Sequence, residues 1–266
     1  MSTHNEKGTA LITGASSGIG ATYAERLAQR GYDLLLVARD LPRLQALSAR
    51  LTEQYGVKIE TLKADLTDKA DLHAVTQRLR TDKGISTLVN NAGMAMNGQL
   101  AEADLDTVDR MILLNVVSLT HLSTAAAANF TAAGRGAIIN IASVVALAPE
   151  MFNAVYSATK AYVLSLTQTL NGEVKAQGLQ VQAVLPGITR TEIWERSGMD
   201  DSALPASMIM EVGEMVDAAL AGFDQGESVT LPSMADTGLW ERYDTARAEL
   251  FAAMQTGQPA PRLLAR

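Results

Sequence analysis

The chain has 266 residues, with 22 basic and 29 acidic side chains, a formal net charge of −7 and no cysteine. The lack of cysteine excludes disulfides, thiolate catalysis and cysteine-bound zinc, and three scattered histidines give no reason to expect a metal site. The acidic balance argues against a nucleic-acid surface, while a polar N-terminus and the lack of any run of about 18 apolar residues predict a soluble, cytoplasmic protein without a membrane span.

Short apolar, β-branched runs alternate with longer segments of helical periodicity. Between the runs, apolar residues recur every three or four positions, as at Ile19, Tyr23 and Leu27. Such alternation predicts a parallel sheet with helices on both faces, and right-handed crossovers make it doubly wound. We therefore expect one Rossmann-type α/β domain over residues 1–266, with its ligand crevice at the carboxyl ends of the strands. The seven expected strands are 9–13, 33–39, 58–63, 86–90, 136–142, 179–185 and 227–231.

Two of the expected helices are long, covering about 106–132 and 152–176. The first contains four consecutive alanines, Ala125 to Ala128, which permit close approach of another helix. Internal packing and a helix-pair subunit interface both fit this run.

A glycine-rich turn, TGASSGIG at residues 13–20, joins the first strand to the first helix. Glycines at Gly14, Gly18 and Gly20 allow the sharp turn and the approach of a phosphate to bare backbone. The helix N-terminus adds amide donors and a partial positive charge. Between a strand and an amphipathic helix, this spacing predicts a nucleotide site.

Several further motifs follow in the order and spacing of a known family. They are NNAG at 90–93, Asn115, Ser143, Tyr156 with Lys160, and PGITRT at 186–191. Over residues 8–231 the chain resembles the short-chain dehydrogenase/reductase family. The resemblance implies catalytic roles for Asn115, Ser143, Tyr156 and Lys160. It implies cofactor contacts for Gly14, Ser16, Ser17, Gly18, Ile19, Gly20, Arg39, Asp65, Leu66, Asn91, Ala92, Gly93, Asn115, Tyr156, Lys160, Pro186, Gly187, Ile188 and Thr191.

The end of the second strand indicates which nicotinamide cofactor is used. In NAD-binding folds of this kind an acidic residue there bonds the adenosine ribose. Here the position holds Ala38, and Arg39 follows. Because an arginine can grip a phosphate with two hydrogen bonds, and by similarity to NADP-preferring members, we expect NADP(H) with Arg39 on the 2′-phosphate. Asp40 either pairs with Arg39 or weakens this clamp, and Ser16 is a second candidate contact.

Two cofactor assignments have structural competitors. The resemblance makes Asp65, with Leu66 beside it, an adenine contact, but a helix-capping role for Asp65 competes. It also makes Asn91 to Gly93 a turn over the adenine ribose, although a purely structural turn explains each of these residues nearly as well.

Tyr156 and Lys160 lie four residues apart on an expected helix and so share a face. A free phenol has a pKa of about 10, so use near neutral pH requires a drop of about three units, or roughly 4 kcal/mol. One positive charge at ~4 Å with an effective dielectric constant near 20 supplies about that much. We therefore expect Lys160, aided by an oxidised nicotinamide, to lower the pKa of Tyr156 and make it an acid or base.

The resemblance implies direct hydride transfer. Ser143 would hold the substrate oxygen, Tyr156 would exchange a proton with it, Lys160 would also hold the nicotinamide ribose, and Asn115 would hold a water that links Lys160 to solvent. The backbone near Ile188 and the Thr191 hydroxyl would meet the nicotinamide carboxamide.

The substrate region is mostly apolar. The resemblance makes residues 188–212 a lid over the substrate. The expected substrate contacts are Ser143, Val145, Met151, Tyr156 and Trp194. An apolar ketone or aldehyde, or the matching secondary alcohol, fits best. Three alternatives stay open: a 3-oxoacyl-carrier-protein reductase, an alcohol or hydroxy-acid dehydrogenase working oxidatively, and an NADP-binding regulatory protein without turnover.

Beyond the last strand, a C-terminal extension of about 232–266 reads as an amphipathic helix followed by a proline-containing tail. It departs from the family pattern, in which the chain ends soon after the seventh strand. We expect a homodimer or a homotetramer.

Overall fold

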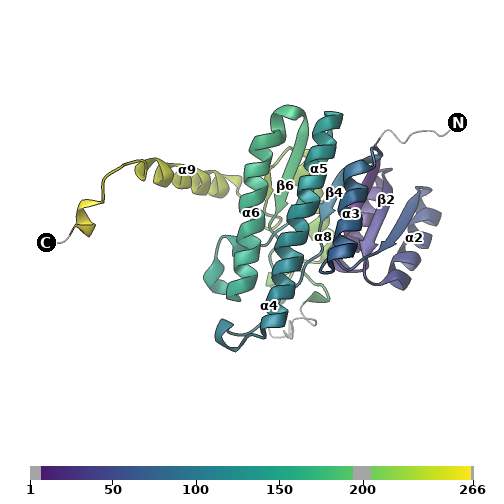
Figure 1. Cartoon of the computed structure of the whole chain (residues 1–266), viewed down its shortest axis with the longest axis horizontal. Coiled ribbons are helices and arrows are strands. Elements are labelled where there is room, and N and C mark those ends of the chain that lie inside the picture. Colours follow the sequence, from purple (N-terminus) through teal and green to yellow (C-terminus); the bar gives the residue numbers. More distant parts are fainter. Residues whose placement is uncertain (1–6, 194–204, 265–266) are drawn as a thin grey trace. The chain divides into compact units, whose positions relative to one another are not determined.

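The protein is described by a computed structural model in which residues 7–193 and 205–264 are placed. Its centre is a parallel sheet of seven strands in the order β3-β2-β1-β4-β5-β6-β7 (Figure 1). This order confirms the predicted Rossmann-type α/β fold. The strands are β1 (Thr9–Thr13), β2 (Asp33–Ala38), β3 (Ile59–Lys63), β4 (Ile85–Asn90), β5 (Gly136–Ile141), β6 (Leu179–Val184) and β7 (Val229–Thr230).

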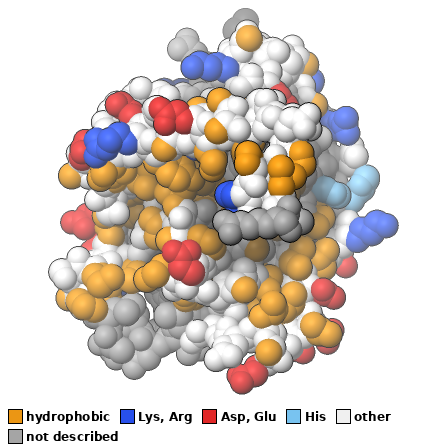
Figure 2. Space-filling view, turned by 90° about the vertical axis from the view of Figure 1, so that its left-hand side faces the viewer, with side chains coloured by type: hydrophobic (Ala, Val, Ile, Leu, Met, Phe, Trp, Pro, Cys, Tyr) orange, Lys and Arg blue, Asp and Glu red, His pale blue; other side chains and the backbone are white. Residues whose placement is uncertain are grey.

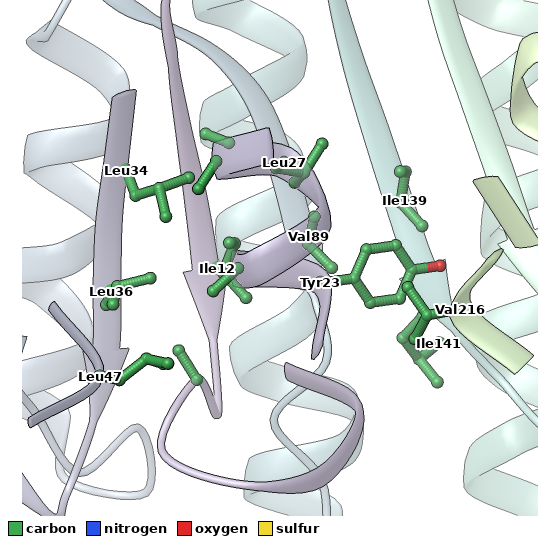
Figure 3. Close-up of a cluster of buried hydrophobic side chains, with 14 of the residues drawn as sticks. Ile12, Tyr23, Leu27, Leu34, Leu36, Leu47, Val89, Ile139, Ile141 and Val216 are labelled. Atoms are coloured by element: carbon green, nitrogen blue, oxygen red, sulfur yellow. The ribbon is translucent and has the colours of Figure 1, made fainter. Parts of the chain in front are cut away.

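The helices lie on both faces of the sheet. They are α1 (Gly18–Gln29), α2 (Leu41–Tyr55), α3 (Lys69–Thr81), α4 (Leu105–Ile112), α5 (Leu119–Ala133), α6 (Ala154–Val174) and α8 (Val212–Asp224). One core cluster packs α1, α2 and α8 against the sheet, and a second packs α3, α5 and the C-terminal part of α6 against the other face. In the first cluster the Tyr23 ring lies among Ile139, Ile141 and Val216 (Figure 3). Strands covered on both faces explain the nearly continuous apolar runs in the sequence.

Aspartates in the loops after β2 and β3 cap the first turns of α2 and α3. The Asp40 carboxylate accepts the Arg43 amide at the start of α2, and Asp68 accepts two amides at the start of α3. Gly56 ends α2 in the left-handed conformation, with φ of +70°. These caps fix where α2 and α3 begin relative to the carboxyl ends of β2 and β3.

The expected helix at 106–132 is present as α4 and α5, which are joined by one π-helical segment at Leu113–Ser118. The whole helix, Leu105–Ala133, is long and apolar enough to span a membrane by length and composition alone. Its apolar side chains Leu122, Ala126 and Phe130 are nevertheless buried in the second core cluster. This packing is that of a core helix. The π segment places Asn115 toward the site described below.

The chain divides into two compact units, Met1–Pro232 and Ser233–Arg266. The second unit corresponds to the predicted extension and contains α9 (Thr237–Ala253), which is capped by Asp236. None of the residues of α9 is buried, and Leu250 and Phe251 are each 62% exposed. Hydrophobic side chains also gather on the molecular face shown in Figure 2. The single-domain expectation, like the dimer or tetramer, stays a prediction.

Candidate active site

The predicted motifs follow the ends of four different strands. The glycine-rich turn follows β1, Asn91 follows β4, Ser143 follows β5, and Pro186 follows β6. Because all seven strands are parallel, these ends lie on one edge of the sheet. The fold therefore gathers motifs that are up to 173 residues apart in sequence, from Thr13 to Pro186.

The glycine-rich turn contains two glycines in left-handed conformation, Gly14 with φ of +64° and Gly18 with φ of +51°. Gly20 is required for a different reason. A Cβ atom there would lie 2.5 Å from Asn91 Nδ2 and closer still to the Gly14 carbonyl oxygen. Gly20 thus allows α1 to pack against its own turn, and the approach of a phosphate is not needed to explain it.

The start of α1 suits a phosphate group. Ser17 precedes the helix in extended conformation and forms no side-chain cap, and the first turn carries no acidic residue. The amides of this turn and the helix dipole are therefore not compensated by a carboxylate of α1 itself. The side chain of Ile19 packs against the first core cluster, and Ser16 is half-buried.

Asn91 fixes the glycine-rich turn from the neighbouring strand. Its Nδ2 donates to the carbonyl oxygens of Thr13 at 2.9 Å and Gly14 at 3.2 Å. The Thr13 hydroxyl in turn accepts the amides of Asn91 and Ala92, each at 3.0 Å. These hydrogen bonds stabilise the turn, which is the structural role considered above as an alternative to a cofactor contact. Gly93 places bare backbone against the catalytic residues, since a Cβ there would lie 3.3 Å from Asn115 Oδ1.

Arg39 is 75% exposed in its side chain and lies 4.0 Å from Asp65, measured from Nη1 to Oδ2. Asp40 caps α2 and lies 3.5 Å from Arg43 Nε. The sequence left two roles open for Asp40, an ion pair with Arg39 or a weakening of its phosphate contact. The structure shows Asp40 paired with Arg43 and not with Arg39. Because the Arg39 guanidinium is exposed at the end of β2, it is available to a phosphate there.

Asp65 does not cap α3, so that alternative was wrong: the capping residue is Asp68. Asp65 instead accepts the amide and the hydroxyl of Thr67, at 3.0 and 2.7 Å. Burial acts to raise the pKa of Asp65, but the Thr67 hydrogen bonds outweigh it and, with Arg39, hold the pKa below its usual value. Leu66 is only 5% exposed and belongs to the second core cluster.

Tyr156, Ser143 and Lys160 meet at the carboxyl end of β5. The Ser143 hydroxyl lies near enough to the Tyr156 phenol to act on its pKa. Lys160 Nζ lies 5.6 Å from the centre of the Tyr156 ring and donates to the Ile141 carbonyl oxygen at 2.9 Å. The α6 helix supplies both Tyr156 and Lys160, as the four-residue spacing predicted.

The predicted lowering of the Tyr156 pKa is not found. Burial raises the pKa of Tyr156 to about 12, and this effect outweighs the lowering effect of the Ser143 side chain. Burial also lowers the pKa of Lys160 to about 8. The physical reason is desolvation, which disfavours the charged form of each group. The phenol is therefore protonated at neutral pH, the form needed to donate a proton.

Asn115 lies in the π-helical segment and is 2% exposed. Its Oδ1 accepts the Met94 amide at 2.9 Å, and its Nδ2 donates to the Met94 carbonyl at 2.9 Å and to Thr159 Oγ1 at 3.1 Å. The Thr159 hydroxyl donates to the Tyr156 carbonyl oxygen at 2.8 Å. Asn115 therefore ties the loop after β4 to the helix that carries Tyr156. Sequence reasoning missed Thr159.

Sequence reasoning also missed Asn153, which is 7% exposed. Its Oδ1 accepts the amides of Val155 and Tyr156, each at 3.1 Å, and its Nδ2 donates to the Gly98 carbonyl at 2.8 Å. The available signal was an asparagine directly before the expected helix, a preferred N-cap.

Four of the five expected substrate residues, all but Trp194, lie in the part of the chain that the structure describes. Val145 donates its amide to the Ser143 hydroxyl at 3.4 Å, and Met151 is 74% exposed. The Phe152 ring packs edge-on against Tyr156, with centroids 5.3 Å apart. Trp194 lies outside the described residues, as does the rest of the lid from 195 to 204.

The segment after β6 begins beside Ser143 and passes the glycine-rich turn. The Pro186 carbonyl accepts the Val144 amide at 3.0 Å, and the Ile188 carbonyl accepts the Met210 amide at 2.9 Å. Thr191 lies against Gly18, where a Cβ would be 3.4 Å from Thr191 Cγ2. Gly187 has open space around the position of a Cβ. Within residues 7–193 and 205–264, no group of three or more acidic or histidine side chains could hold a metal ion.

Comparison with known proteins identifies the family. The model of the short chain dehydrogenases matches residues 8–202. The chain belongs to the short-chain dehydrogenase family. A solved short-chain dehydrogenase from Sphingobium yanoikuyae, in complex with NADPH, is 52% identical to this chain, with a TM-score of 0.93 over 96% of this chain and 99% of that one.

A second solved relative is a "bulky-bulky ketone specific alcohol dehydrogenase" from Comamonas testosteroni. It is 46% identical, with a TM-score of 0.89, and the match covers 97% of this chain and 99% of the other. Among curated proteins, a very-long-chain 3-oxoacyl-CoA reductase from Anas platyrhynchos is 32% identical over 69% of this chain. The match spans only 60% of that reductase. The chain is thus an oxidoreductase of the short-chain dehydrogenase family.

Proposed function

We propose that this protein is an NADP(H)-dependent oxidoreductase that transfers hydride between nicotinamide and an apolar ketone or aldehyde, or the matching secondary alcohol. The observation that carries the proposal is the placement of Ser143, Tyr156 and buried Lys160 on the same edge of the sheet as the glycine-rich turn. Carbonyl reduction needs three things together: a proton donor, a hydroxyl that binds the carbonyl oxygen, and a turn that binds the nucleotide.

Three observations support NADP(H) over NAD(H). The last position of β2, where an acidic residue would bond the ribose, holds Ala38. Arg39, next to it, has an exposed guanidinium. A relative with 52% identity was solved with NADPH. The Asp65 carboxylate lies 4.0 Å from Arg39, and an exposed pair at that distance is weak.

The chain's own residues account for the proton transfer. When bound, the nicotinamide supplies or accepts the hydride. Tyr156, protonated at neutral pH, donates its proton to the substrate oxygen, and the Ser143 hydroxyl holds that oxygen. Lys160, with a pKa of about 8, changes protonation near neutral pH and returns a proton to Tyr156. Asn115 holds the Met94 loop against α6, so that the lysine faces Gly93 across a fixed gap.

The apolar residues near Ser143, together with one named relative, support a bulky apolar substrate. Val144 and Val145 lie in the short 3₁₀ turn that follows Ser143, and Met151 and Phe152 lie at the end of the next one. Met94 and Met96 follow β4 on the same edge of the sheet, and methionine adapts to varied shapes. A relative with 46% identity is named for bulky-bulky ketones.

A 3-oxoacyl thioester reductase is the second candidate. Curated relatives named very-long-chain 3-oxoacyl-CoA reductases favour it. A net charge of −7 disfavours docking of an acidic carrier protein.

A soluble cytoplasmic enzyme fits the buried packing of the long apolar helix.

The test follows absorbance of NADPH, and separately of NADH, with a panel of bulky apolar ketones, small aldehydes and 3-oxoacyl-CoA thioesters. We expect fast NADPH oxidation with the bulky ketones and slow oxidation with NADH. Preference for the thioesters would favour the second candidate. NADPH binding without turnover on the panel or on the matching alcohols with NADP⁺ would contradict the proposal.

A further inference from the structure

The segment after β6 crosses the carboxyl edge of the sheet. Three strands, β5, β4 and β1, separate β6 from β2, so four strand spacings of about 4.8 Å, or about 19 Å, lie between them. Glu192 comes eight residues after the end of β6, a reach of at most about 27 Å. It nevertheless pairs with Arg43 in the first turn of α2, which follows β2. Residues 185–192, which we call the strap, therefore run across the ends of these strands.

The strap passes directly over the glycine-rich turn. Its residue Thr191 lies against Gly18, where a Cβ would be 3.4 Å from Thr191 Cγ2. At its origin the strap is fixed to the catalytic side of the site, because the Pro186 carbonyl accepts the Val144 amide at 3.0 Å. A dinucleotide lying between the glycine-rich turn and Ser143 would have the strap above it.

At its far end the strap contacts α2 through the Arg43–Glu192 ion pair. Arg43 Nη1 lies 3.1 Å from Glu192 Oε1 and 3.0 Å from Oε2. Arg43 is oriented for this contact by Asp40, whose Oδ2 lies 3.5 Å from Arg43 Nε and whose Oδ1 accepts the Arg43 amide. Both partners are about half exposed, at 49% for Arg43 and 42% for Glu192. Water can therefore replace the pair, and it can open and close.

We propose that the Arg43–Glu192 ion pair is a clasp that holds the strap over the bound cofactor and slows cofactor release. Arg43 and Glu192 are positioning residues in this proposal, which rests on the proposed function. The pair joins the helix that follows the adenosine end of the crevice to the segment that begins at its nicotinamide end. Opening the clasp frees the strap from α2 and uncovers the glycine-rich turn.

The experiment measures the dissociation rate of NADPH by stopped-flow fluorescence after mixing the complex with excess NADP⁺. The variants are Arg43→Gln, Glu192→Gln and the double variant. The matched control is Glu60→Gln, which removes an exposed Arg78–Glu60 pair of 2.7 Å between α3 and β3. Each single variant should release NADPH about two- to five-fold faster than wild type, the range expected for an exposed ion pair.

The double variant should release NADPH no faster than the faster single variant, because both substitutions open the same clasp. About 0.5 M salt should bring wild type close to the variants, and Glu60→Gln should match wild type. Unchanged rates in both single variants, or effects that multiply in the double variant, would overturn the clasp. Failure of wild type to bind NADPH would overturn the proposed function and the clasp with it; normal binding with unchanged rates overturns the clasp alone.

Discussion

Gly20 provides a sharp test of how the glycine-rich turn is built. A methyl group at this position would lie 2.5 Å from Asn91 Nδ2 and within 2.8 Å of the Gly14 carbonyl carbon. Both are parts of a tight structure, because Asn91 Nδ2 donates to the carbonyls of Thr13 and Gly14. Gly20→Ala must therefore push the turn and α1 apart even when no cofactor is bound.

The size of the effect follows from three contributions. Overpacking of this kind costs about 1–3 kcal/mol, and weakening the two Asn91 hydrogen bonds costs about 0.5–1.5 kcal/mol each. Alanine is favoured over glycine in a helix by about 1 kcal/mol, which offsets part of the loss. We expect Gly20→Ala to lower the free energy of unfolding by about 1–5 kcal/mol.

The assay is urea unfolding of the cofactor-free protein, followed by circular dichroism. Gly172→Ala in α6 is the matched control, because no atom lies within 4 Å of the position of its Cβ. That variant should gain about 0.5–1 kcal/mol. If Gly20→Ala were as stable as wild type in this assay, the packing explanation would be refuted, and Gly20 would serve the cofactor alone.

Three further outcomes follow from single side chains. Arg39→Asp should weaken NADPH binding about 10- to 100-fold, measured by fluorescence titration, while NADH binding is unchanged or improved; equal losses for both would refute the clamp. Asn153→Ala should lower the free energy of unfolding by about 1 kcal/mol and reduce kcat for bulky ketones, while NADPH affinity is unchanged. Asn153→Asp keeps the N-cap and should keep the stability of wild type. Wild-type kcat in both variants would refute a positioning role. Burial lowers the pKa of Lys160 to about 8, below its unfolded value of about 10.5, so between these values the unfolded chain binds more protons. Stability should therefore rise from pH 8 to 10 relative to Lys160→Met, by at most about 1.4 kcal/mol per pH unit; a flat difference would contradict the lowered pKa.

Local sequence predicted the elements well because each carries its own signal. The run TALIT at 9–13 is β1 to the residue, since a strand buried on both faces carries a nearly continuous run of apolar and β-branched residues. The spacing of Tyr156 and Lys160 predicted a shared helix face, and the structure brings both to the end of β5. The interruption of the 105–133 helix at Asn115 was not predicted, because a π turn depends on tertiary contacts with Met94 and Thr159.

Long-range features were beyond sequence reasoning. The pKa of Tyr156 depends on its burial, which a four-residue spacing does not report. Arg43 and Glu192 are 149 positions apart, and only the crossing of the strap over the sheet edge brings them together. Several polar residues in the loop before α3 could have capped the helix. Propensity alone does not identify Asp68, and not Asp65, as the capping residue.

The measurement that tests the central claim most directly compares wild type with Tyr156→Phe. The phenol is the proton donor in this account, and its ring packing against Phe152 survives the substitution. We expect NADPH-dependent reduction of a bulky ketone to fall by about 10²- to 10⁴-fold, with the Kd for NADPH within about two-fold of wild type. A Tyr156→Phe variant that binds NADPH normally and keeps more than about a tenth of wild-type turnover would contradict the account.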